Sequence, residues 1–162
     1  MKITLRTAEA QDLAAITALE AACFPPAEAA DYVSIRDRLA IYPQHFWLLE
    51  LDGKIVSMVN GLVTDIPKLE DAMYEDSSLH NEAGQWQMIF GVDTHPDYQK
   101  QGLAAMTLRR FIQEAKKQGR KGIVLTCKER LLHYYKKFGF VNEGVSQSSH
   151  GGAVWYDMRL TF

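Results

Sequence analysis

Cysteine is scarce in this chain: its 162 residues include only Cys23 and Cys127. Two isolated cysteines provide neither the paired spacing of a zinc site nor the disulfide framework of a small secreted domain. No apolar run is long enough to cross a membrane. The first residues, Met1 to Arg6, alternate as a strand does and lack the apolar core of a signal peptide. We therefore expect a cytoplasmic protein with no membrane partner and no bound metal.

The chain also lacks internal repeats and low-complexity segments. Hydrophobic residues make up 47% of it and charged residues 23%, which is typical of a soluble globular protein. A chain of 162 residues can bury its own hydrophobic core as one unit. We expect a single domain over residues 1–162.

Basic residues are unevenly distributed. Between Lys100 and Lys137 there are 11 Lys or Arg against only Glu114 and Glu129, which leaves 7 basic and 18 acidic residues elsewhere. This asymmetry predicts one positive and one negative surface. The basic residues could form a solvated helix face, but the acidic remainder and the lack of a binding motif argue against nucleic acid. A small polyanion fits a local positive zone better.

Hydrophobic periodicity and turn signals divide the chain into alternating helices and strands. Helices are expected at about residues 8–23 and 27–40 and over residues 104–117 and 128–138. Strands are expected over residues 2–6, 45–51, 54–63, 86–93, 121–127, from about 140, and about 153–160. Asp52-Gly53 predicts a type I′ hairpin turn, and Thr7 is a plausible helix N-cap. Residues 64–85 read as a long acidic loop with one short helix near residues 69–74.

The stretch from Trp86 to Gly119 is expected to be a strand, a tight turn and a helix that ends at a glycine cap. A helix start presents unpaired N–H groups and the positive end of its dipole, which suits an anion. Gly102 leaves room for a phosphate, and Gln99, Lys100 and Gln101 add donors. Many helices also begin after a glycine for packing alone, so this pattern is weak by itself.

Its context is more specific. The strand end V-D-x-H-P followed by Y-Q-K-Q-G-L-A resembles the acetyl-CoA-binding motif of the GNAT superfamily of N-acetyltransferases. Three further segments resemble the microbial arylalkylamine (serotonin-type) branch: Cys23–Ala30 (CFPPAEAA), Leu125–Phe140 and Ser148–Trp155. The resemblance implies an α/β fold with a GNAT-like mixed central sheet of about seven strands. That sheet would be splayed between strands four and five, with helices on both faces.

The resemblance also implies a co-substrate, acetyl-CoA, and a direct transfer to an amine without an acyl-enzyme. By position, the implied cofactor-binding residues are Phe90, Gly91, Val92, Gln99, Lys100, Gln101, Gly102, Leu103, Ala104, Cys127 and Tyr135. Cys127 is expected to be a small buried residue at a strand–helix junction, since the sequence positions no histidine to activate it.

Acyl transfer from a thioester to an amine needs a donor for the oxyanion, a base for the amine and an acid for the thiolate. By resemblance, the backbone N–H of Val92 is the oxyanion donor and Tyr135 is the general acid. Tyr135 also lies at the spacing of the buried apolar residues of its helix, so a purely structural role in the hydrophobic core is the alternative. The resemblance makes Glu28 the candidate base, although a glutamate at a helix start is ordinarily a surface charge. Ordered water held by polar groups such as Gln87 is the alternative base.

Met88 and Phe90 occupy the positions where the vertebrate enzymes carry a histidine pair that relays the proton of the amine, and neither can move a proton. The implied substrate-binding residues are Phe24, Pro25, Glu28, Met88 and His150. Phe24 could equally be core, and a single loop histidine such as His150 is usually just solvated.

The sequence thus predicts an acetyl-CoA-dependent N-acetyltransferase for a small amine, an arylalkylamine or a polyamine, active as a monomer or homodimer. A peptide or protein acetyltransferase is one alternative. A non-catalytic acyl-CoA sensor is a second, and a structural domain without a ligand is a third.

Overall fold

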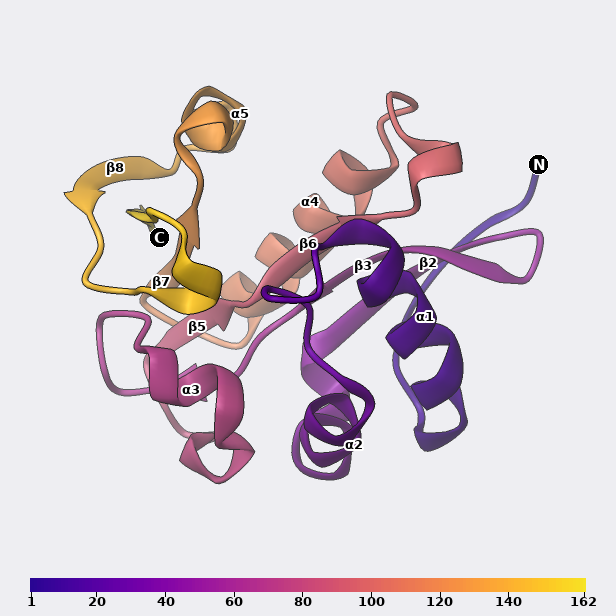
Figure 1. Cartoon of the computed structure of the whole chain (residues 1–162), viewed down its shortest axis with the longest axis horizontal. Helices are drawn as coiled ribbons and strands as arrows, with labels where there is room; N and C mark the ends of the chain where they lie inside the picture. Colours follow the sequence, from indigo (N-terminus) through magenta and orange to yellow (C-terminus); the bar gives the residue numbers. More distant parts are fainter.

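The computed structural model describes all 162 residues. Two sheets lie side by side (Figure 1), and the chain passes between them three times: after residue 60, at residue 90 and after residue 94. The helices are α1 (Leu13–Cys23), α2 (Tyr32–Ile41), α3 (Asp71–Glu75), α4 (Leu103–Lys117) and α5 (Leu132–Lys136). The strands are β1 (Ile3–Thr7), β2 (Phe46–Leu51), β3 (Lys54–Asn60), β4 (Val63–Thr64), β5 (Trp86–Ile89), β6 (Gly91–Thr94), β7 (Gly122–Cys127), β8 (Val141–Val145) and β9 (Tyr156–Thr161).

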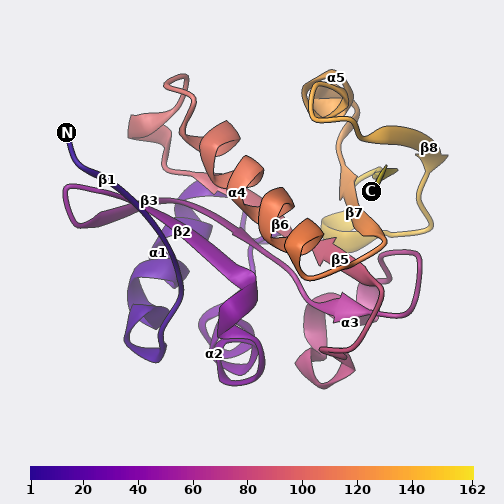
Figure 2. The same ribbon diagram turned by 180° about the vertical axis from the view of Figure 1, so that it is seen from behind.

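The first sheet has the antiparallel order β1-β2-β3-β6 and is covered on both faces. Helices α1 and α2 lie on one face, and α4 crosses the other, as the view from behind shows (Figure 2). Strand β2 serves both layers because alternate side chains of a strand point to opposite faces. Phe46 and Leu48 pack in the cluster under α1 and α2, whereas Leu49 and Leu51 pack with Leu103 of α4. Apolar side chains of β2 are therefore buried on both faces of the sheet.

The second sheet has the order β4-β5-β7-β9-β8 and combines one parallel pair, β5 with β7, with antiparallel neighbours. The mixed α/β architecture expected from the sequence is therefore confirmed. The nine strands come from seven continuous runs, because the runs over residues 54–64 and 86–94 are each interrupted once. No helix combines the length and the apolar character that crossing a membrane requires.

The interruption in the second of these runs is a bulge at Phe90. Asn60 pairs with Gly91, so an unbroken register would place Val63 opposite Met88, yet Val63 pairs with Gln87. One extra residue is thus inserted into the strand, which bends it and ends the pairing. Before the bulge, β5 belongs to the second sheet; after it, β6 belongs to the first. Strands β6 and β7 consequently do not pair, and this is the splay expected between the fourth and fifth runs.

Several predicted boundaries are wrong. The second helix begins at Tyr32 rather than near Ala27, because the Asp31 side chain caps it by accepting the N–H of Ser34 at 2.9 Å. The residues before the cap form a turn in which the carbonyl of Pro25 accepts the N–H of Glu28. Glu28 therefore lies in a loop, not at a helix start.

Two other expectations also change. Thr7 ends strand β1 and caps nothing, since Glu9 is the residue that caps the following turn together with Asp12. The helix expected over residues 128–138 is a 3-10 turn, Glu129–Leu131, followed by the short α5. The turn at Asp52 and Gly53 agrees with the type I′ prediction, with φ of 50° and 85°.

Candidate active site

A cavity of about 490 Å³ opens beside the bulge, where the two sheets separate. Its walls come from segments that are far apart in the sequence: the α1–α2 loop, helices α2 and α3, the bulge, the end of β7, α5 and the loop before β9. Eight of the residues predicted for the site line it: Phe24, Glu28, Phe90, Gly91, Val92, Cys127, Tyr135 and His150.

The open edge of β6 forms one wall. The N–H of His95 bonds the carbonyl of Val56 at 2.9 Å across to β3. Since successive residues of an antiparallel strand alternate in direction, the N–H of Val92, three residues earlier, points away from β3. That edge of β6 has no neighbouring strand. The N–H of Val92 is thus directed toward the space between the sheets and can donate a hydrogen bond to a ligand.

Tyr135 reaches the cavity from α5 and is only 7% exposed. Burial, and then the neighbouring Cys127, raise the pKa of its phenol, so the hydroxyl keeps its proton at neutral pH. Edge-on contacts with Tyr134 and Phe140 fix the ring. Tyr135 is therefore a neutral phenol whose hydroxyl can donate a hydrogen bond.

Cys127 lines the same wall as a thiol. Burial raises its pKa to about 11, and its sulfur lies 3.5 Å from that of Met158. A thiol that stays protonated at neutral pH is a poor nucleophile. The geometry disfavours an acyl-enzyme on Cys127.

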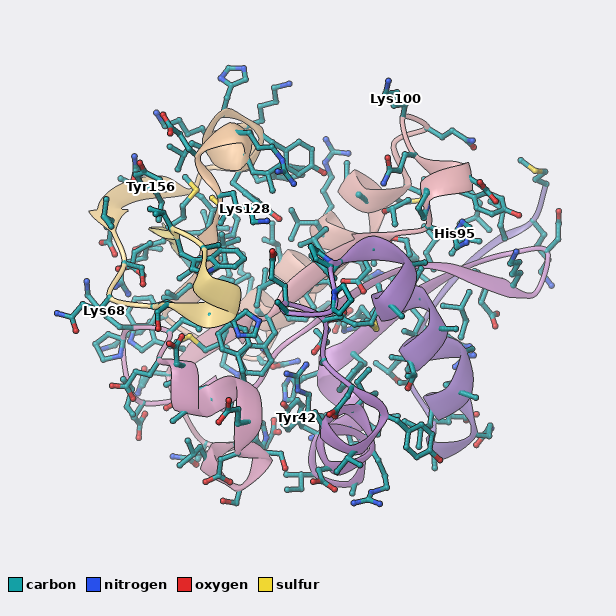
Figure 3. The ribbon with its side chains drawn as sticks, viewed as in Figure 1. Tyr42, Lys68, His95, Lys100, Lys128 and Tyr156 are labelled. Atoms are coloured by element: carbon teal, nitrogen blue, oxygen red, sulfur yellow. The ribbon has the colours of Figure 1, made fainter.

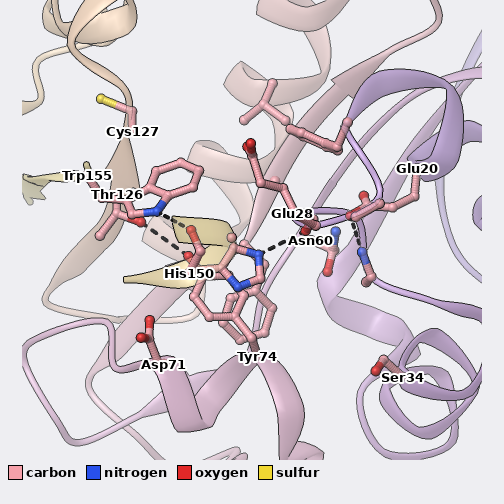
Figure 4. A pocket seen from close by; sticks show the side chains of 18 of the residues that line it. Glu20, Glu28, Ser34, Asn60, Asp71, Tyr74, Thr126, Cys127, His150 and Trp155 are labelled. Atoms are coloured by element: carbon pink, nitrogen blue, oxygen red, sulfur yellow. Dashed lines mark hydrogen bonds between the residues drawn. The ribbon is translucent and has the colours of Figure 1, made fainter. Parts of the chain in front are cut away.

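Two loops that line the cavity are in contact with each other, and Figure 4 shows His150 of one turned toward Glu28 of the other. His150 Nε2 lies 2.9 Å from the carbonyl oxygen of Glu28, and the Glu28 carboxylate accepts a bond from Lys128 Nζ at 2.9 Å. A Cβ on Gly151 would lie 2.6 Å from Glu28 Cγ, so only glycine permits this close approach. Lys128 binds Oε2 of Glu28, which leaves Oε1 without a protein partner.

The lining is acidic and aromatic. Five carboxylate residues contribute to it against a single arginine, Arg38; they are Glu20, Glu28, Asp31, Asp71 and Glu75. The ring of Tyr74 stacks on His150 with centroids 4.5 Å apart and lies 4.9 Å from Phe90. Trp155 donates its indole N–H to the carbonyl of His150 at 2.8 Å. Such a wall favours a cation that carries an apolar or aromatic group.

The predicted phosphate turn lies outside the lining of this cavity, at the start of α4. Gln99, Lys100, Gln101 and Gly102 are exposed there, and Figure 3 shows Lys100 at the tip of the turn, pointing outward. Gly102 caps the helix in the left-handed region, with φ of 79°. Ala104 is half-buried, and the side chain of Leu103 packs into the core. The N–H groups of the first turn have no helical partner.

Two predicted substrate residues do not reach the cavity. Met88 is fully buried in the core under α1 and α2, because its position on β5 precedes the bulge and faces inward. Pro25 is exposed and acts through its carbonyl, which shapes the loop. Sequence reasoning missed other lining residues, including Glu20, Arg38, Tyr74 and Trp155. An arginine on the buried side of a helix was the one available signal.

A second cluster of ligand-type side chains lies on another part of the molecule: His45, His80 and Glu82, whose ligand atoms all lie within 4.8 Å of one another. His80 Nδ1 accepts the N–H of Val63 at 3.0 Å, so its Nε2 carries the proton that bonds Glu82 at 2.9 Å. Arg120 binds the second oxygen of Glu82 at 2.8 Å. Glu82 thus forms an ion pair with Arg120 and hydrogen bonds with both histidines, and these contacts connect the acidic loop to the rest of the protein.

Comparisons with known proteins agree with this geometry. A curated relative, the serotonin N-acetyltransferase of Mesocricetus auratus, is 23% identical over 111 residues. The match covers 68% of this chain but only 52% of the relative, so the chain spans about half the length of that protein.

Two solved structures show the fold. The loading GNATL domain of CurA from Lyngbya majuscula superposes with a TM-score of 0.86 at 20% identity, covering 99% of this chain and 98% of that one. A GNAT family acetyltransferase from Brucella melitensis in complex with acetyl-CoA gives a TM-score of 0.64 at 18% identity, covering 99% and 88%. The profile of the Acetyltransferase (GNAT) family matches residues 13–140. The chain belongs to the GNAT family of acetyltransferases.

Proposed function

We propose that this protein is an N-acetyltransferase that moves the acetyl group of acetyl-CoA directly to the primary amine of a small molecule, an arylalkylamine or a polyamine. The observation that carries the proposal is the bulge at Phe90. It directs the N–H of Val92 into a cavity that Tyr135 also lines. Both cysteines are free thiols, which suits a protein of the reducing cytoplasm.

The acetyl-CoA site would extend from α4 to the cavity. The free N–H groups at the start of α4, with Gln99, Lys100 and Gln101 around them, would hold the pyrophosphate. The gap between β6 and β7 would take the pantetheine arm, which can pair with the open edge of β6 as an added strand would. Phe90, Gly91, Val92 and Cys127 would then surround the thioester.

The chain supplies a group for each charge change of the reaction. The N–H of Val92 would stabilise the oxyanion of the tetrahedral intermediate. Tyr135, held as a neutral phenol by its burial, would protonate the departing thiolate. The acidic lining would attract the ammonium form of the amine, and the aromatic wall of Phe24, Tyr74 and Trp155 would hold its apolar part.

The amine must lose a proton before it attacks. Glu28 is the proposed acceptor, since Oε1 has no protein partner and Lys128 keeps the carboxylate in place through Oε2. His150, whose ring bonds the Glu28 carbonyl, would position this loop and border the amine. The positions of the vertebrate histidine pair, Met88 and Phe90, contribute no proton transfer.

The test is release of free thiol from acetyl-CoA with a panel of amines: tryptamine, phenethylamine, spermidine, a lysine peptide and a free amino acid. We expect turnover with the aryl amines or with spermidine. Turnover with the peptide alone would replace the small-molecule acceptor by a peptide. Tight acetyl-CoA binding without any turnover would contradict the enzyme and favour a sensor.

A further inference from the structure

Arg38 is a buried cation in the wall of the cavity. It lies in the last turn of α2 and is 4% exposed. A guanidinium remains charged at any physiological pH and carries five N–H donors. Here Nη2 donates to the carbonyl of Tyr74 at 2.9 Å and Nη1 to Oδ1 of Asn60 at 3.3 Å. The other three donors have no protein partner, and Nε is fully buried without one.

No carboxylate forms an ion pair with Arg38, whereas the half-buried Arg6, Arg120 and Arg159 each bind an acidic side chain. Glu20 of α1 lines the same cavity, and Asp93 of β6 and Asp31 at the start of α2 are close enough for the charge of Arg38 to lower their pKa. Glu20 is engaged with the N–H of Ala30 at 3.0 Å, and Asp93 is fully buried without a hydrogen-bond donor from the protein. Burial, and then the charge of Glu20, raise the pKa of Asp93 well above its usual range, so Asp93 is neutral. Neither acid forms a direct hydrogen bond or ion pair with Arg38.

A buried charge without a direct counter-ion is costly unless a ligand completes it. The location of Arg38 fits a ligand. Its guanidinium lies over the ring of Phe90, 4.7 Å from the centroid, and Phe90 is the bulge residue beside which the acyl group and the amine would meet. Asn60, 1% exposed, lines the cavity next to it and offers an amide. An anionic group bound to Arg38 would thus lie within a few atoms of the reacting centre.

We propose that Arg38 is a carboxylate-binding residue and that one of the two substrates carries a carboxylate near its reacting atom. This inference rests on the acyl transfer from CoA to an amine in the proposed function. It replaces one of the two substrates named there, the acetyl donor or the uncharged amine, by one that carries a carboxylate. A planar guanidinium with several free donors matches a carboxylate through paired hydrogen bonds. The carboxylate belongs either to an amino-acid-like amine or to a dicarboxylic acyl group on CoA. In both cases the surrounding acidic residues would exclude an anion that does not reach Arg38.

The experiment measures binding by calorimetry, so it needs no turnover. In the acceptor arm, protein saturated with CoA is titrated with tryptophan against tryptamine and with phenylalanine against phenethylamine. In the donor arm, free protein is titrated with succinyl-CoA against butyryl-CoA. We expect the carboxylate-bearing member of one arm to bind about 10- to 100-fold more tightly, the range for a charge-assisted hydrogen-bonded contact.

Arg38→Gln should abolish this preference and leave the affinity of the uncharged member within about twofold. Arg36→Gln, on the exposed side of the same helix, is the matched control and should change neither value. If Arg38→Gln does not fold, Arg38→Lys retains the charge but not the planar pair of donors, and the preference should fall several-fold. No preference in either arm, or an equal loss for both members of a pair, overturns the proposal.

The experiments distinguish failure of the proposed carboxylate site from failure of the proposed acetyltransferase activity. Thiol release without any carboxylate preference would remove the subsite and keep the acetyltransferase. A carboxylate preference that depends on Arg38, with no thiol release from any pair, would keep the subsite and remove the enzyme.

Discussion

Gly102 offers a direct test of the proposed phosphate turn, because its effect on stability can be separated from its effect on binding. Its φ of 79° is strained for any residue with a Cβ, yet a Cβ added there would meet nothing within 4 Å. Gly102→Ala should therefore lower the free energy of unfolding only through the left-handed backbone conformation, by about 1 kcal/mol. For a domain of this size, that lowers the melting temperature by about 2–4 °C.

Acetyl-CoA binding should suffer more. The added methyl group would stand beside the N–H groups that receive the phosphate, and each charge-assisted hydrogen bond contributes about 1.5–3 kcal/mol. Loss of one such bond weakens binding about 10- to 100-fold. Calorimetric titration of acetyl-CoA measures this affinity, and chemical denaturation measures stability.

A matched control is available in the β2–β3 hairpin. Gly53 has a φ of 85° and equally open surroundings, so Gly53→Ala should lose the same stability and keep full acetyl-CoA affinity. Equal affinities for the two variants would refute the assignment of the α4 start as the phosphate site.

Three further predictions concern the cavity and the loop cluster. Tyr135→Phe should lower kcat about 100-fold or more, as expected for loss of a general acid, while acetyl-CoA affinity changes less than twofold; equal changes would make Tyr135 a packing residue. Glu28→Gln should shift the pH–rate profile toward higher pH, because the amine must then lose its proton to solvent; an unchanged profile would exclude Glu28 as the base. Acid should weaken the fold through the His45–His80–Glu82 cluster. Burial lowers the pKa of both histidines below 6.5, and their hydrogen bonds outweigh burial to lower the pKa of Glu82 to about 2. The unfolded chain therefore takes up protons first, and stability should fall as pH drops from about 6.5 toward 2. Glu82→Gln should remove the part of this fall below about pH 4.5, which comes from the lowered pKa of Glu82 itself, and an equally steep fall there in denaturation curves would contradict the mechanism.

The sequence predicted the elements that depend on local patterns. The period of apolar residues identified α1 and α4, and the Asp52-Gly53 turn identified the β2–β3 hairpin. The family motifs gathered residues that are far apart in the chain, and Phe24, Val92 and Tyr135 do line one cavity. These predictions depended on residue patterns within single short segments, which do not depend on contacts with the rest of the chain.

What the sequence did not predict depends on contacts between distant segments. The cap by Asp31 and the bond from Lys128 decide where α2 begins and what Glu28 contacts. The inward direction of Met88 follows from a one-residue slip in strand pairing, which no pattern within the strand itself reveals. Arg38 is held in the cavity wall by a hydrogen bond to the carbonyl of Tyr74, in the short helix α3 of the acidic segment, whose sequence has no clear period.

The most direct measurement of acetyl transfer is mass spectrometry after incubation of the protein with acetyl-CoA, labelled isotopically in the acetyl group, and the amine panel. The geometry predicts label on the amine nitrogen, none on Cys127, and a greatly reduced yield with Tyr135→Phe. Label retained on the protein would contradict direct transfer, and label that remains on CoA with every amine would contradict the enzyme itself.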